Sequence, residues 1–208
     1  MLTTTTALLA ALPLAFANAG PAPIGIDETA PVITRDDIVI HAPLEKVWRI
    51  QTDVENWPDW QPNVSSSVKQ TPGALRPGSS WVWSTEGLEG ITSTVKQVQP
   101  QRRIVWGGPA QGITAVHVWT FTQAADGVHV HTEESWTGEP VDADVEYLQG
   151  ALDASLDHWL HNLKQRSEQL STRSRNAERP ALLNRRRGSV DREERGGIGE
   201  PVLRSSPA

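Results

Sequence analysis

Apolar and polar residues alternate through the middle of the chain, from Val64 to Thr137. This period of two, interrupted by turns that contain glycine or proline, is typical of an antiparallel β-sheet. It predicts six strands, near residues 64–70, 79–86, 89–98, 102–107, 113–123 and 128–137. A short β-branched segment at 37–41 predicts one more strand before them. The run Gly107-Gly108-Pro109 is predicted to end the strand that begins near residue 102.

Helical periodicity flanks the predicted sheet on both sides. Residues 44–52 follow a proline and carry apolar residues at helical spacing, and a second short helical segment stops at Pro58. After Pro140, apolar residues recur every three or four positions from about Asp142 to Gln169, which predicts one long amphipathic helix. The apolar stripe consists of Val145, Leu148, Leu152, Leu156, Trp159 and Leu163. We therefore predict an α+β fold, with a seven-stranded curved antiparallel sheet wrapped on a long C-terminal helix.

The aromatic residues indicate a single domain. All nine tryptophans of the 208-residue chain lie between Trp48 and Trp159. The net charge of −6 argues against nucleic-acid binding, which needs a basic surface. The chain has no cysteine, so disulfides, thiolate nucleophiles and cysteine–zinc sites are excluded. We expect no cofactor and no metal.

Both ends differ in composition from this domain. Residues 1–19 contain an apolar run followed by Ala17-Asn18-Ala19, which predicts a signal peptide, but no lysine or arginine precedes the run. Both a secreted and a cytoplasmic localisation therefore stay open. The run is too short for a stable membrane insertion. Residues 20–36 are predicted to form a linker, and residues 171–208 an arginine-rich disordered tail. A basic tail of this kind could also serve as an interaction module.

Short motifs spread over residues 37–170 resemble a known superfamily. They are Ile38–Trp48, Trp57–Trp60, Val95–Pro100, Ile104–Trp106, His117–Phe121 and Val130–Gly138. In these motifs the chain resembles the START-like (SRPBCC) superfamily, in particular its polyketide cyclase/dehydrase and lipid-transport branch. The resemblance implies a helix-grip fold around a cavity for a small hydrophobic ligand. The superfamily includes cyclases, aromatases and carriers of lipids and hormones, so the fold does not decide between reaction and carriage.

The last two predicted strands bring a histidine and a carboxylate together. If the turn Ala124–Gly127 pairs Gln123 with Val128, then Phe121 faces Val130, Trp119 faces Thr132, and His117 faces Glu134. The pair would lie on the inward, largely apolar face of the sheet. Burial raises the pKa of a carboxyl group, so His117 and Glu134 are candidate catalytic residues. A buried polar pair that anchors the hairpin, or that binds a ligand oxygen without chemistry, is the competing interpretation.

The tryptophans are candidate ligand contacts. Buried indoles need partners for their N–H groups, and a ligand that carries oxygens would supply them. The residues predicted to line the ligand site are Trp57, Trp60, Trp83, Trp106, Trp119, Trp136, Leu152 and Trp159. Each of these residues, taken alone, is also compatible with simple core packing.

A rival polar set is His129, His131 and Glu133, which alternate along one strand as metal ligands can. We place this face on the solvent side, where no fourth ligand is evident. Two main hypotheses remain. The first is that the chain is a carrier of a hydrophobic small molecule, which fails if side chains fill the interior solid. Alternatively, it is a cyclase- or dehydratase-like enzyme, which His117 and Glu134 on opposite faces of the sheet would exclude. The oligomeric state is left open.

Overall fold

The computed structural model describes residues 23–187, with side chains for residues 23–169. Its centre is one antiparallel sheet of seven strands in the order β1-β7-β6-β5-β4-β3-β2. The strands are β1 (Val32–Ile40), β2 (Val64–Lys69), β3 (Ser80–Thr85), β4 (Leu88–Gln99), β5 (Arg103–Ala110), β6 (Ile113–Ala124) and β7 (Gly127–Thr137). All seven predicted strands are therefore present.

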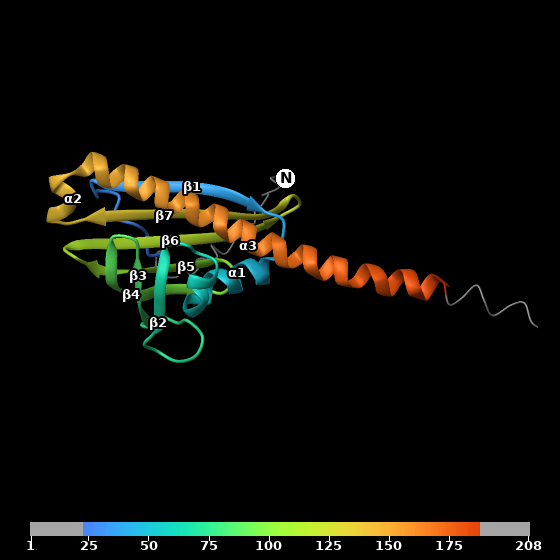
Figure 1. The fold of residues 1–208 in the computed structure, drawn as a ribbon. Coiled ribbons are helices and arrows are strands. Elements are labelled where there is room, and N and C mark those ends of the chain that lie inside the picture. Colours follow the sequence, from blue (N-terminus) through green and yellow to red (C-terminus); the bar gives the residue numbers. More distant parts are fainter. Residues whose placement is uncertain (1–22, 188–208) are drawn as a thin grey trace, which may run out of the picture.

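Helices cover one face of this sheet. The segment after β1 forms α1 (Leu44–Thr52) and the 3-10 helix η1 (Val54–Asp59), and the segment after β7 forms α2 (Glu139–Ala143) and α3 (Val145–Arg187). The long α3 runs along β1 and β7 and continues past the end of the sheet (Figure 1). This arrangement is the predicted helix-grip fold. Of the predicted apolar stripe, Val145 is exposed because it lies at the start of α3, whereas Leu152, Leu156, Trp159 and Leu163 are buried.

The first strand begins earlier than the sequence indicated. Residues 32–36, predicted to belong to the linker 20–36, form the first part of β1. Charged residues at 35–37 concealed the strand, and two of them have a partner on the neighbouring β7. Arg35 Nε lies 3.2 Å from Glu133 Oε2, and Asp37 Oδ1 lies 3.0 Å from His131 Nδ1. The predicted signal peptide, residues 1–19, lies outside the described residues.

The predicted break at Gly107-Gly108-Pro109 does not interrupt β5, which continues to Ala110. Glycine is required here by close strand contacts. A Cβ atom added to Gly108 would lie 2.2 Å from the carbonyl oxygen of Thr92 on β4. Pro109 pairs only with Thr114 of β6, at a position where the pairing of β5 with β4 has ended. The glycines therefore permit close approach of the neighbouring strands, and the proline lies where β5 is paired on one side only.

The C-terminal tail also departs from the prediction. Residues 171–187, predicted to be disordered, continue α3 to Arg187. The prediction relied on the loss of apolar periodicity, but extending an existing helix needs no new nucleus. Arginine, alanine, leucine and glutamate in this segment are also good helix formers. The rest of the predicted tail, and with it most of the proposed interaction module, lies outside the part of the chain for which side chains are described.

Candidate functional site

Indole rings occupy the space between the sheet and α3. Trp57 of η1 is fully buried, and its ring packs edge-to-face on Trp159 of α3 with the centroids 4.9 Å apart. It makes the same contact with Trp81 and Trp83 of β3, at 5.6 Å each. Further contacts extend this set along β5 and β6. The tryptophan cluster consists of Trp57, Trp60, Trp81, Trp83, Trp106, Trp119 and Trp159. Edge-to-face and offset contacts of this kind are favourable aromatic geometries.

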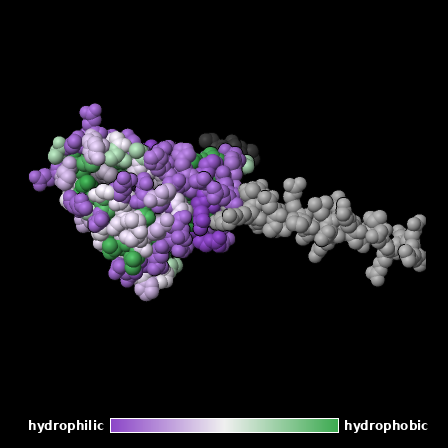
Figure 2. Space-filling model, in the orientation of Figure 1, coloured by the Kyte–Doolittle hydropathy of each residue, from purple (hydrophilic) through white to green (hydrophobic). Residues whose placement is uncertain are grey.

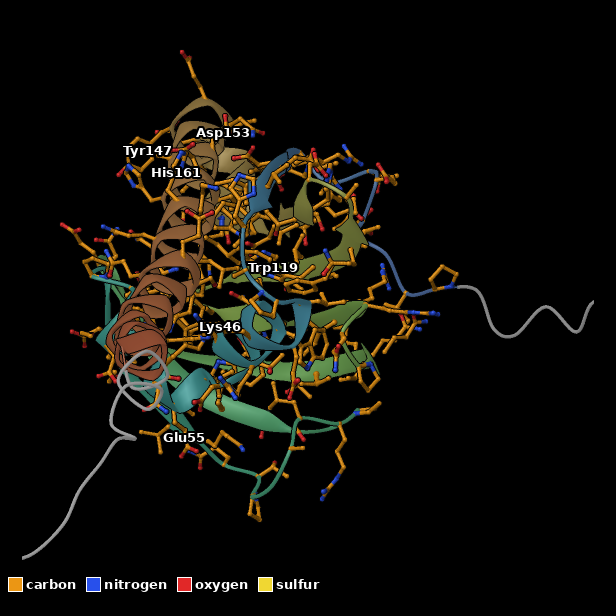
Figure 3. The ribbon with its side chains drawn as sticks, turned by 90° about the vertical axis from the view of Figure 1, so that its right-hand side faces the viewer. Lys46, Glu55, Trp119, Tyr147, Asp153 and His161 are labelled. Carbon is orange, nitrogen blue, oxygen red and sulfur yellow. The ribbon has the colours of Figure 1, made fainter. Side chains whose placement is uncertain are left out.

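This packing argues against the preformed cavity that the sequence predicted. Trp57 and Trp119, which were expected to line a cavity, are 0% exposed, so these two rings border no open space. Figure 3 shows Trp119 inside the fold, between the sheet and the helices, whereas Tyr147 lies at the periphery. On the face seen in Figure 2 polar residues predominate, with apolar residues only in small patches. A ligand that enters the tryptophan cluster must therefore displace rings.

A surface hollow lies next to the tryptophan cluster, between η1 and α3. It has a volume of about 280 Å³, and Pro58, Trp60, Asn162 and Arg166 are among the residues that line it. Trp60 is half-buried, and its ring contacts Trp159 at 6.2 Å. The hollow therefore leads from solvent to the outer edge of the tryptophan cluster.

A pair of amide side chains lies beside this hollow: Asn162 lines it and is half-buried, and Gln61 is buried. Gln61 Nε2 donates to the backbone carbonyl of Trp159 at 3.3 Å, and Asn162 Nδ2 donates to Gln61 Oε1 at 3.0 Å. We call Gln61 and Asn162 the amide latch, because they tie the segment after η1 to α3. Gln61 is 3% exposed, so these bonds are shielded from water and are correspondingly strong.

The predicted hairpin register is confirmed. Gln123 pairs with Val128, and His117 pairs with Glu134. Both side chains lie on the inner face, with His117 Nδ1 3.0 Å from Glu134 Oε2. The imidazole packs between the rings of Trp106 and Trp119, with centroid distances of 5.0 and 5.1 Å. The two candidate catalytic residues therefore form a buried pair beside the tryptophan cluster.

Neighbouring side chains determine which nitrogen of His117 carries the hydrogen. The hydroxyl of Thr132 donates to the backbone carbonyl of Val118 at 3.2 Å, so its oxygen is left to accept from His117 Nε2 at 2.8 Å. In a neutral imidazole, Nδ1 then has no hydrogen and can only accept. Glu134 Oε1 accepts from Trp136 Nε1 at 2.8 Å, which leaves Oε2 of a protonated carboxyl to donate to Nδ1. The contacts thus fit a neutral acid–imidazole pair.

Burial favours the same neutral pair. It lowers the pKa of His117 from 6.5 to about 3. It raises the pKa of Glu134 from 4.5 to about 7, although the hydrogen bond from Trp136 acts in the opposite direction. Both shifts have the same cause, which is the cost of a charge away from water. A carboxyl group that titrates near neutrality can act as a proton donor at physiological pH.

The predicted ligand contacts do not all lie together. Six of the eight are in the tryptophan cluster, whereas Trp136 and Leu152 pack in a second apolar group around Val32, Val141 and Leu156. Trp136 still contacts Glu134 through its indole N–H. Its role is therefore to hold the carboxyl group, and Leu152 is removed from the tryptophan cluster.

Sequence reasoning missed three site residues. Trp81 is fully buried in the tryptophan cluster, and Thr132 sets the hydrogen on His117. Gln51 of α1 is also 0% exposed, and its Oε1 accepts from Trp159 Nε1 at 3.1 Å. The sequence signal for Gln51 is its position one helical turn after Val47, which places a polar residue on the apolar, inward face of α1. A helical wheel alone does not distinguish such a residue from one at the polar boundary.

The rival set of His129, His131 and Glu133 is divided among separate partners. His129 Nε2 lies 2.8 Å from Asp126 Oδ1, whereas His131 and Glu133 contact Asp37 and Arg35. Across residues 23–169, no three histidine or acidic side chains are arranged to hold a metal ion. Within the described part of the chain, none of the helices has the length and apolar character needed to cross a bilayer.

Comparisons with known proteins show which proteins share this fold. The profile of the family described as polyketide cyclase / dehydrase and lipid transport matches residues 31–168. Among solved structures, the hypothetical protein jhp0584 from Helicobacter pylori is 18% identical, with a TM-score of 0.60 over 72% of this chain and 99% of that chain. A START superfamily protein from Mycobacterium smegmatis is 13% identical, with a TM-score of 0.55 over 66% of this chain and 98% of that chain.

A protein from a biosynthetic pathway is also similar. The di-domain ARO/CYC protein StfQ from the steffimycin pathway is 18% identical, with a TM-score of 0.56 over 68% of this chain and 52% of that chain. No curated protein matches the sequence. At these identities, the solved structures establish a shared fold and leave the ligand open.

Proposed function

Because the chain belongs to the polyketide cyclase/dehydrase and lipid-transport family, we propose that it binds a small hydrophobic ligand among the rings of the tryptophan cluster. The observation that carries this proposal is the concentration of seven indoles between the sheet and α3, beside the buried His117–Glu134 pair. Apolar walls with few polar groups are typical of small-molecule sites. Indole surfaces favour an aromatic ligand, such as a polyketide, over an aliphatic one.

The ligand enters by opening the fold at the hollow between η1 and α3. Trp60 and Trp159 are the rings nearest this hollow, and Trp159 is the more deeply buried of the two. Displacing them requires the amide latch to open, because Gln61 bonds to the backbone of Trp159 itself. Binding then has an energetic cost that a rigid, preformed cavity would not have.

A ligand screen on the purified chain tests this proposal. Thermal shift and tryptophan fluorescence are measured with aromatic polyketides, flavonoids, sterols and fatty acids. A true ligand raises the melting temperature by mass action, since it stabilises the folded state by about 2.7 kcal/mol at a hundred times its Kd. Trp159→Leu should weaken binding, whereas Tyr147→Ala, on the same helix but 70% exposed, should not. Absence of a shift in all four classes would contradict the proposal.

The second candidate function is a cyclase- or dehydratase-like reaction, and the geometry of the His117–Glu134 pair favours it. In a dehydration, His117 Nδ1 would accept a proton from a ligand carbon. Glu134 would deliver its proton to the neighbouring hydroxyl, whose C–O bond breaks and releases water. The pair thus provides one proton acceptor and one proton donor, and transfer of the gained proton from His117 Nδ1 to Glu134 Oε2 restores both.

Glu134→Gln separates carriage from catalysis. The amide keeps the shape of the protonated carboxyl group and can still donate to His117 Nδ1 and accept from Trp136. A ligand found by the screen is incubated with both proteins, and the product is followed by mass spectrometry. Turnover by the wild type that Glu134→Gln abolishes, with binding retained, supports catalysis. Unchanged ligand with both proteins identifies a carrier.

A further inference from the structure

Three buried N–H groups in and beside the tryptophan cluster lack a hydrogen-bond partner. They are Nε1 of Trp81, Nε1 of Trp119 and the amide Nε2 of Gln51. The three side chains are each 0% exposed, so water does not satisfy these groups at the surface. Buried polar groups in folded proteins are nearly always bonded, and an exception needs an explanation. Three such groups around one set of rings indicate hydrogen-bonding capacity directed at a ligand.

The orientation of the Gln51 amide is fixed by its neighbours. Trp159 Nε1 lies 3.1 Å from Gln51 Oε1, and an indole nitrogen can only donate. The amide oxygen must therefore face Trp159, which leaves the NH₂ group as the free end. The backbone carbonyl of Gln51 accepts from Trp57 Nε1 at 3.0 Å, so the residue is held between two rings of the tryptophan cluster.

Acceptor groups near the tryptophan cluster are already engaged. Glu134 Oε1 accepts from Trp136, and Glu134 Oε2 lies against His117 Nδ1. Ser93 Oγ accepts from Trp83 Nε1 at 3.0 Å. Ser67 Oγ, on the edge strand β2, is also buried without a partner, and a hydroxyl can donate as well as accept. Among the described residues, the spare capacity here is therefore mainly that of donors.

We propose that this site selects aromatic ligands whose oxygens only accept hydrogen bonds, namely aromatic ketones or quinones, over the corresponding alcohols or phenols. This inference rests on the proposed function. A carbonyl oxygen accepts from the free N–H groups and brings no donor of its own. A hydroxyl group brings a hydrogen for which the tryptophan cluster offers few free acceptors, and an unsatisfied buried donor weakens binding. A site whose polar groups match one ligand commonly rejects an analogue that would leave a buried polar group unpaired.

The ring arrangement suits a flat ligand. Trp119 lies nearly parallel to Trp106, at 19° and a centroid distance of 6.2 Å, and nearly parallel to Phe121, at 20° and 6.4 Å. A planar aromatic ligand can lie parallel to the rings of this row.

Three compounds with one skeleton test the proposal: 9-fluorenone, 9-fluorenol and fluorene. They differ only in a C=O, CHOH or CH₂ group at one position. Dissociation constants are measured by fluorescence and calorimetry with the full chain. We expect fluorenone to bind about tenfold more tightly than fluorenol, which is the effect of roughly one unsatisfied hydrogen-bonding group. Equal affinities, or tighter binding of the alcohol, would overturn the inference.

Matched variants locate the donors. Trp81→Phe and Trp119→Phe each remove one free N–H group, and at least one of them should bring the affinity ratio of fluorenone to fluorenol close to one. Phe121→Leu is the control, because it alters the ring beside Trp119 and changes no N–H group or acceptor. It should leave the ratio unchanged. A ratio that survives both donor variants would also overturn the inference.

The outcomes separate this inference from the proposed function. If none of the three compounds binds, this inference fails, whereas the proposed function is decided by the screen of four ligand classes. If fluorene and fluorenol bind as well as fluorenone, the hydrophobic site stands and only the selection of acceptor oxygens is wrong.

Discussion

Thr132 accepts a hydrogen bond from Nε2 of His117 across 2.8 Å, because its own hydroxyl hydrogen is directed at the carbonyl of Val118. This contact leaves Nδ1 of the imidazole facing Glu134 at 3.0 Å. A residue that touches no proposed ligand thus determines the direction in which a proton can move within the His117–Glu134 pair.

Replacing Thr132 tests that relationship. Thr132→Val keeps the shape of the side chain but leaves the Nε2 hydrogen of His117 buried without an acceptor. We expect a loss of about 1–3 kcal/mol in the free energy of unfolding, measured by urea denaturation. The ¹⁵N shifts of His117 should also show a change of tautomer. Thr122→Val, at an exposed position of β6, is the control and should alter neither quantity. Unchanged ¹⁵N shifts in Thr132→Val would contradict the assignment.

The pH dependence of stability reports the charge of Glu134. Its pKa rises from 4.5 to about 7 on folding, so the folded state keeps a proton that the unfolded state releases. The contribution of Glu134 to stability is therefore present below pH 4.5 and declines as the pH rises to 7. His117 acts in the opposite sense, because its pKa falls from 6.5 to about 3, and its contribution grows from pH 3 to 6.5.

A comparison of Glu134→Gln with the wild type isolates the contribution of the Glu134 carboxyl group to stability, since the two proteins share all other titratable groups. The free energy of unfolding of the variant, relative to the wild type, should increase by about 3 kcal/mol between pH 4.5 and 7. Urea denaturation across this range measures the difference. A difference that stays constant would mean that Glu134 is already ionised at pH 4.5, and that the pair is an ion pair.

The amide latch should control the rate of ligand exchange. Gln61→Leu removes the bond to Trp159 and the acceptor of Asn162. We expect the association rate to rise and Kd to fall, because in the wild type these hydrogen bonds must break before the ligand binds. Stopped-flow fluorescence measures both rates. Arg166→Ala, which lines the same hollow outside the latch, is the control. Rates that match the wild type would place the entrance elsewhere.

Two glycines with opposite environments test the sheet packing. A Cβ atom at Gly107 would lie 2.1 Å from the carbonyl oxygen of Ala115, whereas one at Gly150 of α3 would meet nothing within 4 Å. Gly107→Ala should destabilise the fold by about 3 kcal/mol or more, since backbone must move. Gly150→Ala should stabilise it by about 0.5–1 kcal/mol through helix propensity. Thermal denaturation of both variants compares them, and a tolerated Gly107→Ala would show that β5 and β6 lie further apart.

Much of the site followed from local sequence. The turn at Ala124–Gly127 and the alternation on either side set the register that joins His117 to Glu134, because a one-residue slip would turn every apolar side chain outward. The start of β1 was not evident from the sequence, since Arg35 and Asp37 find partners in Glu133 and His131, on a strand almost a hundred residues away.

The sequence by itself determined which faces are buried, because apolar periodicity reports the side of each element that leaves water. It therefore specified the sheet, the helix that covers it and the inward position of the tryptophans. Only the tertiary structure decided whether those faces enclose space. That depends on how indole rings from η1, β3, β5, β6 and α3 interlock, and here Trp57 fills the centre. The tertiary structure also decided that the N–H groups of Gln51, Trp81 and Trp119 have no partner, since the positions of neighbouring side chains determine whether a buried donor finds an acceptor.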